Sequence, residues 1–187
     1  MKDRAPVQSA LLVTVPPAQS VARWVRWRFD PSARGRMPPH VTVLYPFVLP
    51  PLSDEVIHTL RDLFAGVAPF RFSLTQVAWF GERVVYLVPE PSGPFEDLTW
   101  KVVEKFPGYL PYGGAYGTDR VVPHLTLGTS GPSAALRRAA LKVASRLPVH
   151  AVATEVLLMV RHSGRKPWRA LESFSLGGGS SGGAVDF

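Results

Sequence analysis

Pro39-His40-Val41-Thr42-Val43 and Pro123-His124-Leu125-Thr126-Leu127 state one pattern twice: proline, histidine, apolar, threonine, apolar. The two histidines lie 84 positions apart, and composition does not explain the repeat because only 5 of 187 residues are histidine. Successive side chains of a β-strand point to opposite faces, so each histidine shares a face with its threonine and the apolar residues share the other. Each copy therefore predicts a core-anchored strand that presents an imidazole beside a hydroxyl.

The composition is that of a folded, globular protein, with 46% apolar and 19% charged residues. There are no cysteines, which excludes disulfides and thiolate metal sites. The apolar run at residues 10–15 is too short for a signal-peptide core, and no stretch approaches the roughly 20 residues of a membrane-spanning helix. We therefore expect a cytoplasmic monomer that does not associate with membranes.

The chain is basic, with 21 lysines and arginines against 14 acidic residues and a net charge of +7. Much of the excess lies in residues 23–36 and 137–169. A basic balance favours anionic partners such as phosphates or nucleic acid. Solvated surface arginines explain the same count equally well, so charge alone does not identify a partner.

Hydrophobic periodicity and turn residues predict an alternation of strands and helices. The helix after Ser53 has the clearest signals, because Ser53 is a good N-cap and Asp54 and Glu55 favour the first turn. In the first helix, Val21, Trp24, Val25 and Arg28 are spaced for one face. The expected strands are 7–15, 40–47, a hairpin over 70–88, 149–161 and 170–176, besides the second motif strand; the expected helices are 20–28, 54–65, 95–106 and 133–147; the expected loops include 32–39 and 107–120.

This order predicts an α+β fold with mostly antiparallel sheets. Because the motifs recur half a chain apart, the simplest architecture is bilobal and pseudo-two-fold symmetric, with two sheets flanking a central cleft. We expect one such domain over residues 1–176. The glycine- and serine-rich tail, residues 177–187, is expected to be disordered.

Two imidazoles and two hydroxyls on facing strands suit in-line displacement at phosphorus. One neutral histidine can remove a proton from the nucleophile while a protonated one gives a proton to the leaving oxygen, since the pKa of histidine is about 6.5. Threonine hydroxyls can donate to the non-bridging phosphate oxygens. The acid, the base and the oxyanion donors then all come from the protein, and no metal or other cofactor is required.

Two other interpretations of the histidines stay open at this point. A zinc site usually takes a third protein ligand, and neither motif has a carboxylate within a few residues on its own face, Asp119 being nearest. Alternatively, each histidine is an ordinary core residue with the neighbouring threonine as its partner. A single copy would favour that explanation, whereas two matched copies favour a shared chemical role.

The two copies, read as Pro-His-Val-Thr-Val-Leu and Pro-His-Leu-Thr-Leu-Gly, resemble the paired HxT motifs of the 2H phosphoesterase superfamily. The branch they resemble is the 2′-5′ RNA ligase-like, RNA 2′,3′-cyclic phosphodiesterase group. The resemblance covers roughly residues 7–176 and includes the hairpin between the lobes and the tyrosine- and glycine-rich run before the second motif.

The resemblance implies a bilobal fold with both motifs in a central cleft, helices on the outside and no metal. It implies hydrolysis of 2′,3′-cyclic phosphates of RNA ends or nucleotides to 2′-phosphomonoesters, or reversible 2′-5′ RNA ligation. His40 and His124 would be the catalytic pair, and Thr42 and Thr126 would hold the phosphate. His124 would then activate water as the base, and His40 would protonate the leaving 3′-oxygen.

Further residues are candidates for substrate binding. Arg161 ends a predicted strand and could reach a phosphate, and Arg120 precedes the second motif. Tyr45, Tyr116 and Trp168 could stack on a base, although burial in the core is the commoner fate of aromatic residues.

Three functions fit these observations. The first is a metal-independent phosphodiesterase acting on cyclic phosphates of RNA or nucleotides. The second is a related enzyme for a small non-RNA phosphodiester, such as an ADP-ribose cyclic phosphate, or for a 2′-5′-linked oligonucleotide. The third is a non-catalytic module that binds RNA or nucleotides through its basic regions.

Overall fold

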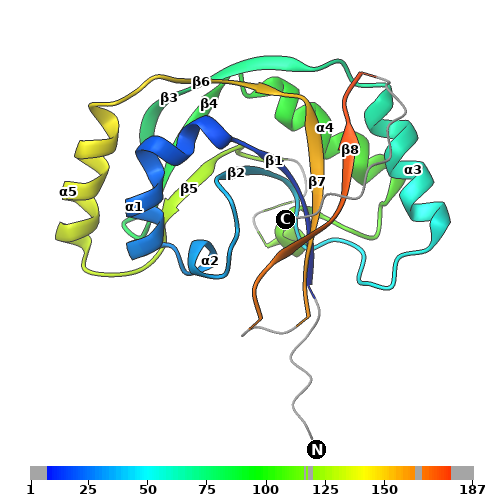
Figure 1. Ribbon diagram of the computed structural model, residues 1–187, viewed down its shortest axis with the longest axis horizontal. Coiled ribbons are helices and arrows are strands. Elements are labelled where there is room, and N and C mark those ends of the chain that lie inside the picture. The colour runs from blue at the N-terminus through cyan, green and yellow to red at the C-terminus, as the bar shows by residue number, and fades with distance from the viewer. Residues whose placement is uncertain (1–7, 116, 118–119, 163–165, 178–187) are drawn as a thin grey trace, which may run out of the picture.

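The computed structural model describes residues 8–115, 117, 120–162 and 166–177, and these form strands, helices and two short 3-10 helices (Figure 1). In chain order the elements are β1 (Gln8–Thr14), η1 (Pro16–Ala18), α1 (Gln19–Phe29), α2 (Pro31–Arg34), β2 (His40–Leu44), α3 (Asp54–Ala65), β3 (Phe70–Phe80), β4 (Val84–Glu90), α4 (Gly93–Lys105), η2 (Pro111–Gly114), β5 (Leu125–Gly128), α5 (Ser133–Ala144), β6 (Val149–Ala153), β7 (Glu155–Arg161) and β8 (Arg169–Ser175).

The strands form two four-stranded sheets with antiparallel pairing throughout. Their orders are β2-β1-β7-β8 and β5-β4-β3-β6. Each motif strand is therefore an edge strand, β2 of the first sheet and β5 of the second. The predicted α+β class with antiparallel sheets is confirmed.

The chain repeats one unit: a strand, a helix, a motif strand and a second helix. The first copy is β1-α1-β2-α3 and the second is β4-α4-β5-α5, and in each the first strand pairs with the motif strand. The helix of each copy packs against the motif strand of the other copy: α1 packs against β5, and α4 packs against β2. The hydroxyl of Thr99 on α4 fixes one crossing by donating to the carbonyl of Val43 at 2.8 Å. The pseudo-two-fold arrangement predicted from the motif spacing is thus visible in the topology.

One hydrophobic core lies between the two sheets and the helices. The apolar residues of both motif strands, Val41, Val43, Leu125 and Leu127, are buried in it. A smaller cluster on the other face of the first sheet contains Ala10, Leu12, Met37, Leu157, Met159 and Trp168. The shared core makes the two halves one packed body, and it holds both edge strands in place from behind.

The helix predicted after Ser53 is confirmed as α3, and the Ser53 hydroxyl accepts the N–H of Val56. The hairpin over 70–88 is confirmed as β3 and β4. The first motif strand ends at Leu44, three residues before the predicted limit. The predicted loop 32–39 contains part of α2, whose N-cap Asp30 accepts the N–H of Ser32.

The prediction of a single strand over 149–161 is wrong. The segment forms β6, which pairs with β3, and β7, which pairs with β1 and β8, so the chain passes from one sheet to the other at Thr154. The carbonyl of Thr154 accepts the N–H of Leu176. Continuous apolar character can indicate strands, but it does not determine which sheet each part joins.

The predicted inner face of the first helix is also wrong in part. The buried residues of α1 are Val21, Ala22, Val25, Arg26 and Phe29, whereas Trp24 and Arg28 are exposed. The buried face of α1 therefore includes Arg26 in place of Trp24 and Arg28, and Arg26 can be buried because it pairs with Asp30 at 2.9 Å.

Among the described residues no helix is long and apolar enough to cross a membrane. Residues 178–187 of the predicted tail lie outside the described part of the chain.

Candidate active site

The motif strands β2 and β5 lie next to each other, so that the two sheets meet at their motif edges. A small cavity of about 20 Å³ is lined by residues 42–44 of β2 and by Tyr45, which follows β2. Val121, Val122 and Pro123, before β5, line its other side. Along both motifs, the histidine and threonine are half-buried and the apolar neighbours are fully buried. The alternation predicted from the sequence therefore holds in both copies.

The two imidazoles are oriented in the same way. The Nδ1 of His40 lies 2.7 Å from the carbonyl oxygen of Pro38, and the Nδ1 of His124 lies 2.7 Å from the carbonyl oxygen of Val122. A carbonyl can only accept, so each Nδ1 carries the proton and each neutral ring has its lone pair on Nε2. Each motif therefore fixes its own tautomer through the backbone two residues earlier.

Both histidines favour the neutral form. The pKa of His40 is lowered from 6.5 to about 4, first by burial and then by the charge of Arg26 and the presence of His124, against the hydrogen bond to Pro38 and the charge of Asp30. Burial also lowers the pKa of His124, against its hydrogen bond to Val122. The effect of His124 on His40 places the two rings within electrostatic range of each other.

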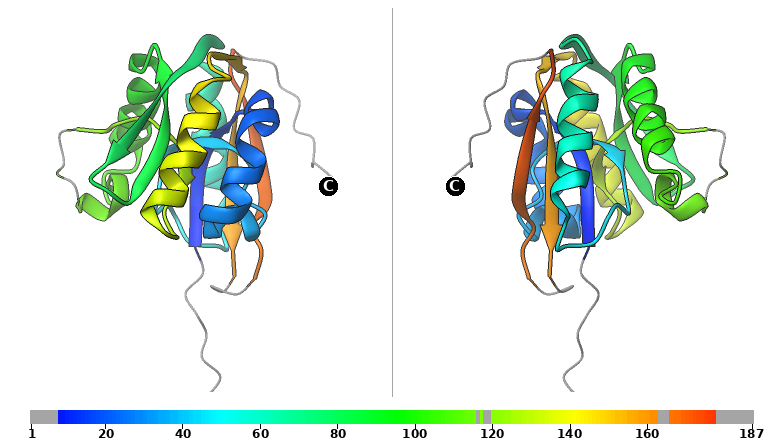
Figure 2. Two further views of the ribbon diagram at one scale, coloured as in Figure 1. Left: turned by 90° about the vertical axis from the view of Figure 1, so that its left-hand side faces the viewer. Right: turned by 90° about the vertical axis from the view of Figure 1, so that its right-hand side faces the viewer.

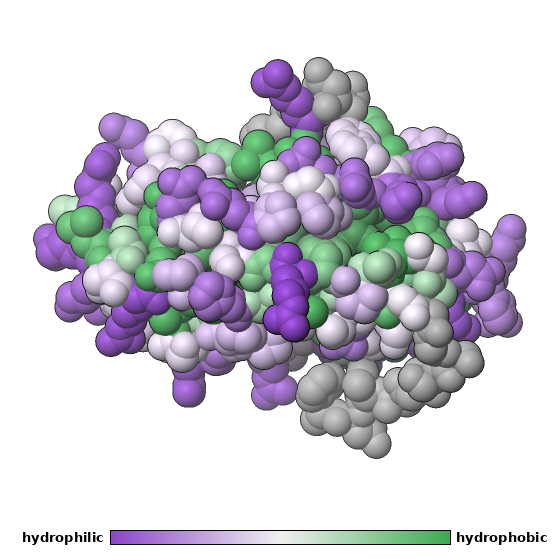
Figure 3. All heavy atoms as spheres, turned by 90° about the horizontal axis from the view of Figure 1, so that it is seen from above, coloured by the Kyte–Doolittle hydropathy of each residue, from purple (hydrophilic) through white to green (hydrophobic). Residues whose placement is uncertain are grey.

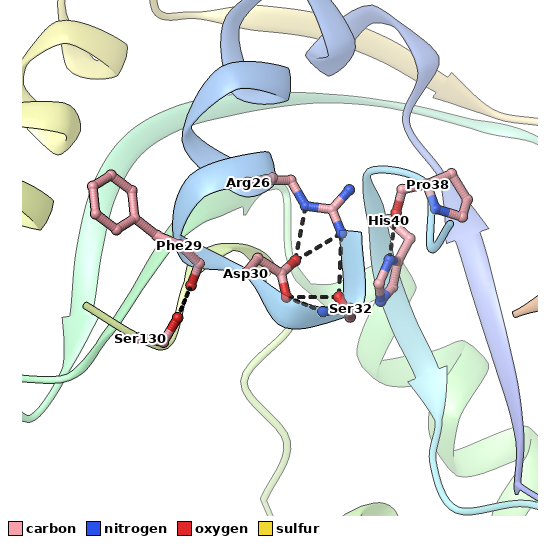
Figure 4. A network of polar contacts seen from close by, with 7 residues as sticks. All are labelled: Arg26, Phe29, Asp30, Ser32, Pro38, His40 and Ser130. Atoms are coloured by element: carbon pink, nitrogen blue, oxygen red, sulfur yellow. Dashed lines mark hydrogen bonds and ion pairs between the residues drawn. The ribbon is translucent and has the colours of Figure 1, made fainter. Parts of the chain in front are cut away.

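A buried ion pair lies beside His40 (Figure 4). Nε and Nη2 of Arg26 donate to Oδ2 of Asp30 at 3.1 and 2.9 Å, and the other carboxylate oxygen accepts from the backbone N–H and hydroxyl of Ser32 at 2.9 and 2.7 Å. The pair is thus supported by hydrogen bonds on both oxygens, as a buried ion pair requires. It connects the C-terminal end of α1 to the environment of His40.

His124 instead lies among aromatic rings. Its ring meets Phe80 and Tyr86 edge-on, with centroids 5.0 and 5.4 Å away, and lies nearly parallel to Tyr112 at 6.3 Å. Phe80 and Tyr86 stack on each other at 4.1 Å. Tyr86 is paired in register with Thr126, which places it beside the second motif on the same face.

Neither the ion pair beside His40 nor the aromatic rings around His124 were predicted from the sequence. Arg26 and Asp30 are separated by four residues, which is the spacing of a helical ion pair and could have indicated their contact. Phe80 and Tyr86 reach His124 through the register between β3, β4 and β5, and no local pattern indicates them. Tyr112 reaches it from η2, within the tyrosine- and glycine-rich run before the second motif.

Three of the candidates for substrate binding, Tyr45, Arg161 and Trp168, form one cluster at the end of the first sheet away from His40. The ring of Trp168 meets Tyr45 edge-on at 6.4 Å, and the guanidinium of Arg161 lies 4.9 Å from its centroid. Gln8 joins the cluster by donating to the Tyr45 hydroxyl at 3.0 Å and accepting from Arg161 Nε at 2.9 Å. Trp168 is 7% exposed and packs in the smaller hydrophobic cluster, so little of its surface faces solvent.

The remaining candidates are less closely tied to the motifs. Arg120 is exposed on the segment that leads to the second motif. Tyr116 lies outside the described residues. In the described part of the chain, no group of three histidine, aspartate or glutamate side chains is placed to hold a metal ion.

A sequence model of the 2′-5′ RNA ligase superfamily matches residues 16–165, which include both motifs. A search of curated protein sequences gives no match.

Solved structures show the same fold. TT0787 of Thermus thermophilus is 22% identical, with a TM-score of 0.57, over 91% of this chain and 98% of that chain. E. coli LigT complexed with 3′-AMP is 19% identical, with a TM-score of 0.54, over 91% and 98%. A phosphoesterase structure is 18% identical, with a TM-score of 0.52, over the same shares. At these identities the likeness concerns the fold.

Proposed function

Since the chain belongs to the 2′-5′ RNA ligase superfamily, we propose that it is a metal-independent phosphodiesterase that hydrolyses 2′,3′-cyclic phosphates of RNA ends or nucleotides to 2′-phosphomonoesters. One observation carries the proposal: His40 begins the edge strand β2, and His124 directly precedes the neighbouring edge strand β5. Each histidine has its Nδ1 held by a backbone carbonyl and a half-buried threonine two residues later. E. coli LigT, which shares the fold, has been crystallised with 3′-AMP and with phosphate, and this agrees with a nucleotide phosphate as ligand.

The reaction needs one proton removed and one proton supplied. Water attacks the phosphorus while Nε2 of His124 takes its proton, and the bond from phosphorus to the 3′-oxygen breaks as His40 protonates that oxygen. The product carries its phosphate on the 2′-oxygen. Thr42 and Thr126 donate to the non-bridging oxygens, where negative charge increases in the transition state. The same path with the 5′-hydroxyl of a second strand in place of water forms a 2′-5′ phosphodiester, and the reversal of that step cleaves the 2′-5′ bond and restores the cyclic phosphate.

As the acid in this scheme, His40 needs a proton that its lowered pKa does not give it in the empty site. An imidazolium with a low pKa is a strong proton donor, but in the empty site it is rarely protonated at neutral pH. The phosphate anion of a bound substrate favours the charged ring and raises the pKa of both histidines. We therefore propose that His40 gains its proton as the substrate binds.

Tyr45 is proposed to contact the nucleoside, because it directly follows β2 and lines the small cavity beside the first motif. Arg161, in the same cluster, is proposed to contact a phosphate. Gln8 and Trp168 hold these two side chains in position. Arg120, on the segment before the second motif, is proposed to border the cleft mouth.

The test is turnover of cytidine 2′,3′-cyclic phosphate in EDTA by wild type, His40→Asn and His124→Asn. Asparagine keeps a donor near the Nδ1 position, so that the contacts with Pro38 and Val122 survive while acid–base function is lost. Each variant should lose activity by at least about 10²-fold. Full activity in either variant would refute the mechanism.

The assignment of acid and base has its own measurement. A cyclic substrate with sulfur in place of the 3′-oxygen has a leaving group that needs no proton. His40→Asn should recover much of its loss on this substrate, whereas His124→Asn should not. The opposite pattern would exchange the two roles.

A further inference from the structure

The exposed sides of α1 and α5 form one surface outside the cleft. The two helices lie side by side at one end of the molecule (Figures 1 and 2). We call this surface the α1–α5 face and define it by its exposed cations and its exposed apolar residues. The cations are Arg23, Arg28, Arg137, Arg138 and Lys142, and the apolar residues are Trp24, Trp27 and Leu141.

The charge of the α1–α5 face is all of one sign. Neither α1 nor α5 contains an aspartate or glutamate. The two ion pairs formed within the described residues are Arg26–Asp30 and Arg61–Glu172, so no cation of the face has a carboxylate partner there. By contrast, α3 and α4 together carry six carboxylates against three cations. The molecule is therefore electrically polarised, with a cationic end that attracts polyanions.

Aromatic side chains lie among these cations. Trp27 is 64% exposed and Trp24 is 41% exposed, which is unusual for a residue type that is ordinarily well buried. They are three positions apart and so lie on the same side of α1, about 4.5 Å apart along its axis. Lys142 Nζ lies 5.9 Å from the Trp24 ring centroid and connects the two helices. Figure 3 shows hydrophilic side chains along the end that α5 forms, with hydrophobic ones between them.

The C-terminal end of α1 lies between the α1–α5 face and the candidate active site. The carbonyl of Phe29, the last residue of α1, accepts the N–H groups of Thr129 and Ser130. Figure 4 shows the same carbonyl accepting the Ser130 hydroxyl, with the buried ion pair of Arg26 and Asp30 between Phe29 and His40. An open pocket of about 410 Å³ lies at the same junction. Ser130 lines it together with Ser133 and Leu136 of α5. Glu82 and Arg83 line it as well, and they follow Phe80, whose ring meets that of His124.

Exposed aromatic rings among unpaired cations are what sequence-independent binding of single-stranded nucleic acid uses: cations follow the phosphates, and rings stack on bases. We propose that the α1–α5 face binds the single-stranded RNA that precedes the cyclic-phosphate end held in the cleft, which makes an RNA strand a better substrate than a mononucleotide. This inference rests on the proposed function for the identity of the bound end. A symmetric dimer through this face would bring like charges together, which disfavours a second copy as the occupant.

The experiment uses two substrates and one binding probe. Turnover is measured with cytidine 2′,3′-cyclic phosphate and with a ten-nucleotide RNA that ends in a cyclic phosphate. Binding is measured by fluorescence anisotropy of the same labelled RNA with a 3′-phosphate, over a series of KCl concentrations. The variants are Trp27→Ala, Trp27→Phe and the double variant Arg138→Ala/Lys142→Ala. The matched control is Lys101→Ala/Lys105→Ala, which removes the same charge from α4.

We expect Trp27→Ala to weaken RNA binding by at least about 5-fold, and Trp27→Phe to keep most of it. Arg138→Ala/Lys142→Ala removes two cations that contact phosphates, and it should reduce the slope of log affinity against log salt concentration by about 1.4. The control should keep wild-type binding, and all variants should turn over the mononucleotide like wild type.

Several results would overturn the proposal. One is an equal loss in the α4 control, and another is an equal loss on mononucleotide and RNA. A third is a result in which the face variants lose binding to vesicles of phosphatidylcholine and phosphatidylserine but keep wild-type RNA binding. That result would assign the face to membranes. If RNA binding depends on the face but neither cyclic substrate is turned over, the face is supported and the proposed catalytic function fails.

Discussion

Replacing His40 by asparagine should change how the stability of the protein depends on pH. In the folded protein the pKa of His40 is lowered from 6.5 to about 4, mainly by burial. The unfolded chain therefore binds a proton at this residue more readily than the folded one. The stability that comes from keeping the ring neutral is present above pH 6.5 and is lost as the pH falls toward about 4.

The size of the effect follows from the two pKa values. A pKa difference of one corresponds to about 1.4 kcal/mol, so the whole difference for His40 is worth about 3 kcal/mol once the pH is below both values. Between pH 7 and pH 5 the unfolded state becomes mostly protonated at this residue and the folded state does not, which amounts to about 2 kcal/mol. The ring is half-buried, and screening by solvent makes this the upper figure.

Urea unfolding of wild type and His40→Asn at pH 7, 6 and 5 measures the effect. The free energy of unfolding of wild type should fall by up to about 2 kcal/mol more than that of the variant over this range. Asparagine can still donate to the Pro38 carbonyl, so the comparison removes titration and keeps the contact. Thr42→Ala is the matched control, because it alters the same face of β2 without removing an ionisable group and should keep the wild-type pH dependence. Equal pH dependence in wild type and His40→Asn would show that burial does not keep His40 neutral.

Two further predictions concern the packing behind the site. Asp30→Ala leaves the guanidinium of Arg26 buried without its partner and should lower the free energy of unfolding by about 3–5 kcal/mol, as measured by urea unfolding. A loss below about 1 kcal/mol would mean that the Arg26 side chain moves into solvent in the variant. Gly128→Ala places a methyl group 2.7 Å from Cβ of Phe29 and 2.9 Å from Cδ1 of Leu136, and overpacking of this kind costs about 1–3 kcal/mol. Gly108→Ala, where nothing lies within 4 Å of the added carbon, should change the melting temperature little, and an equal effect of both substitutions would contradict the crowding argument.

The sequence predicts the features of this fold that depend on local periodicity. Alternation over five residues is enough to separate His40 and Thr42 from Val41 and Val43, because side chains change face at every step along a strand. The N-cap and apolar spacing after Ser53 likewise lie within one helix. The repeat of the motif indicates two related halves, since each copy needs its own supporting strand and helix.

Features that depend on distant partners could not be predicted in this way. The split of 149–161 into β6 and β7 follows from pairing with β3 in one sheet and β1 in the other, and both pairings join residues far apart in the chain. The burial of Arg26 contradicts the general preference of arginine for the surface and becomes possible through the carboxylate of Asp30. Two of the aromatic residues around His124, Phe80 and Tyr86, come from β3 and β4 and are revealed by the register, whereas Tyr112 comes from η2.

The two halves repeat the backbone of the site but differ in what surrounds it. Each histidine has the same contact from Nδ1 to a carbonyl, whereas His40 lies beside an ion pair and His124 lies among aromatic rings. In the proposed mechanism the two histidines hold opposite protonation states, and identical surroundings would give them equal pKa values. The charge of Arg26 lowers the pKa of His40 more than Asp30 raises it, and among the described residues no charged group shifts the pKa of His124 in this way. The duplicated motif thus supplies two equivalent groups, and residues outside the motif make them chemically different.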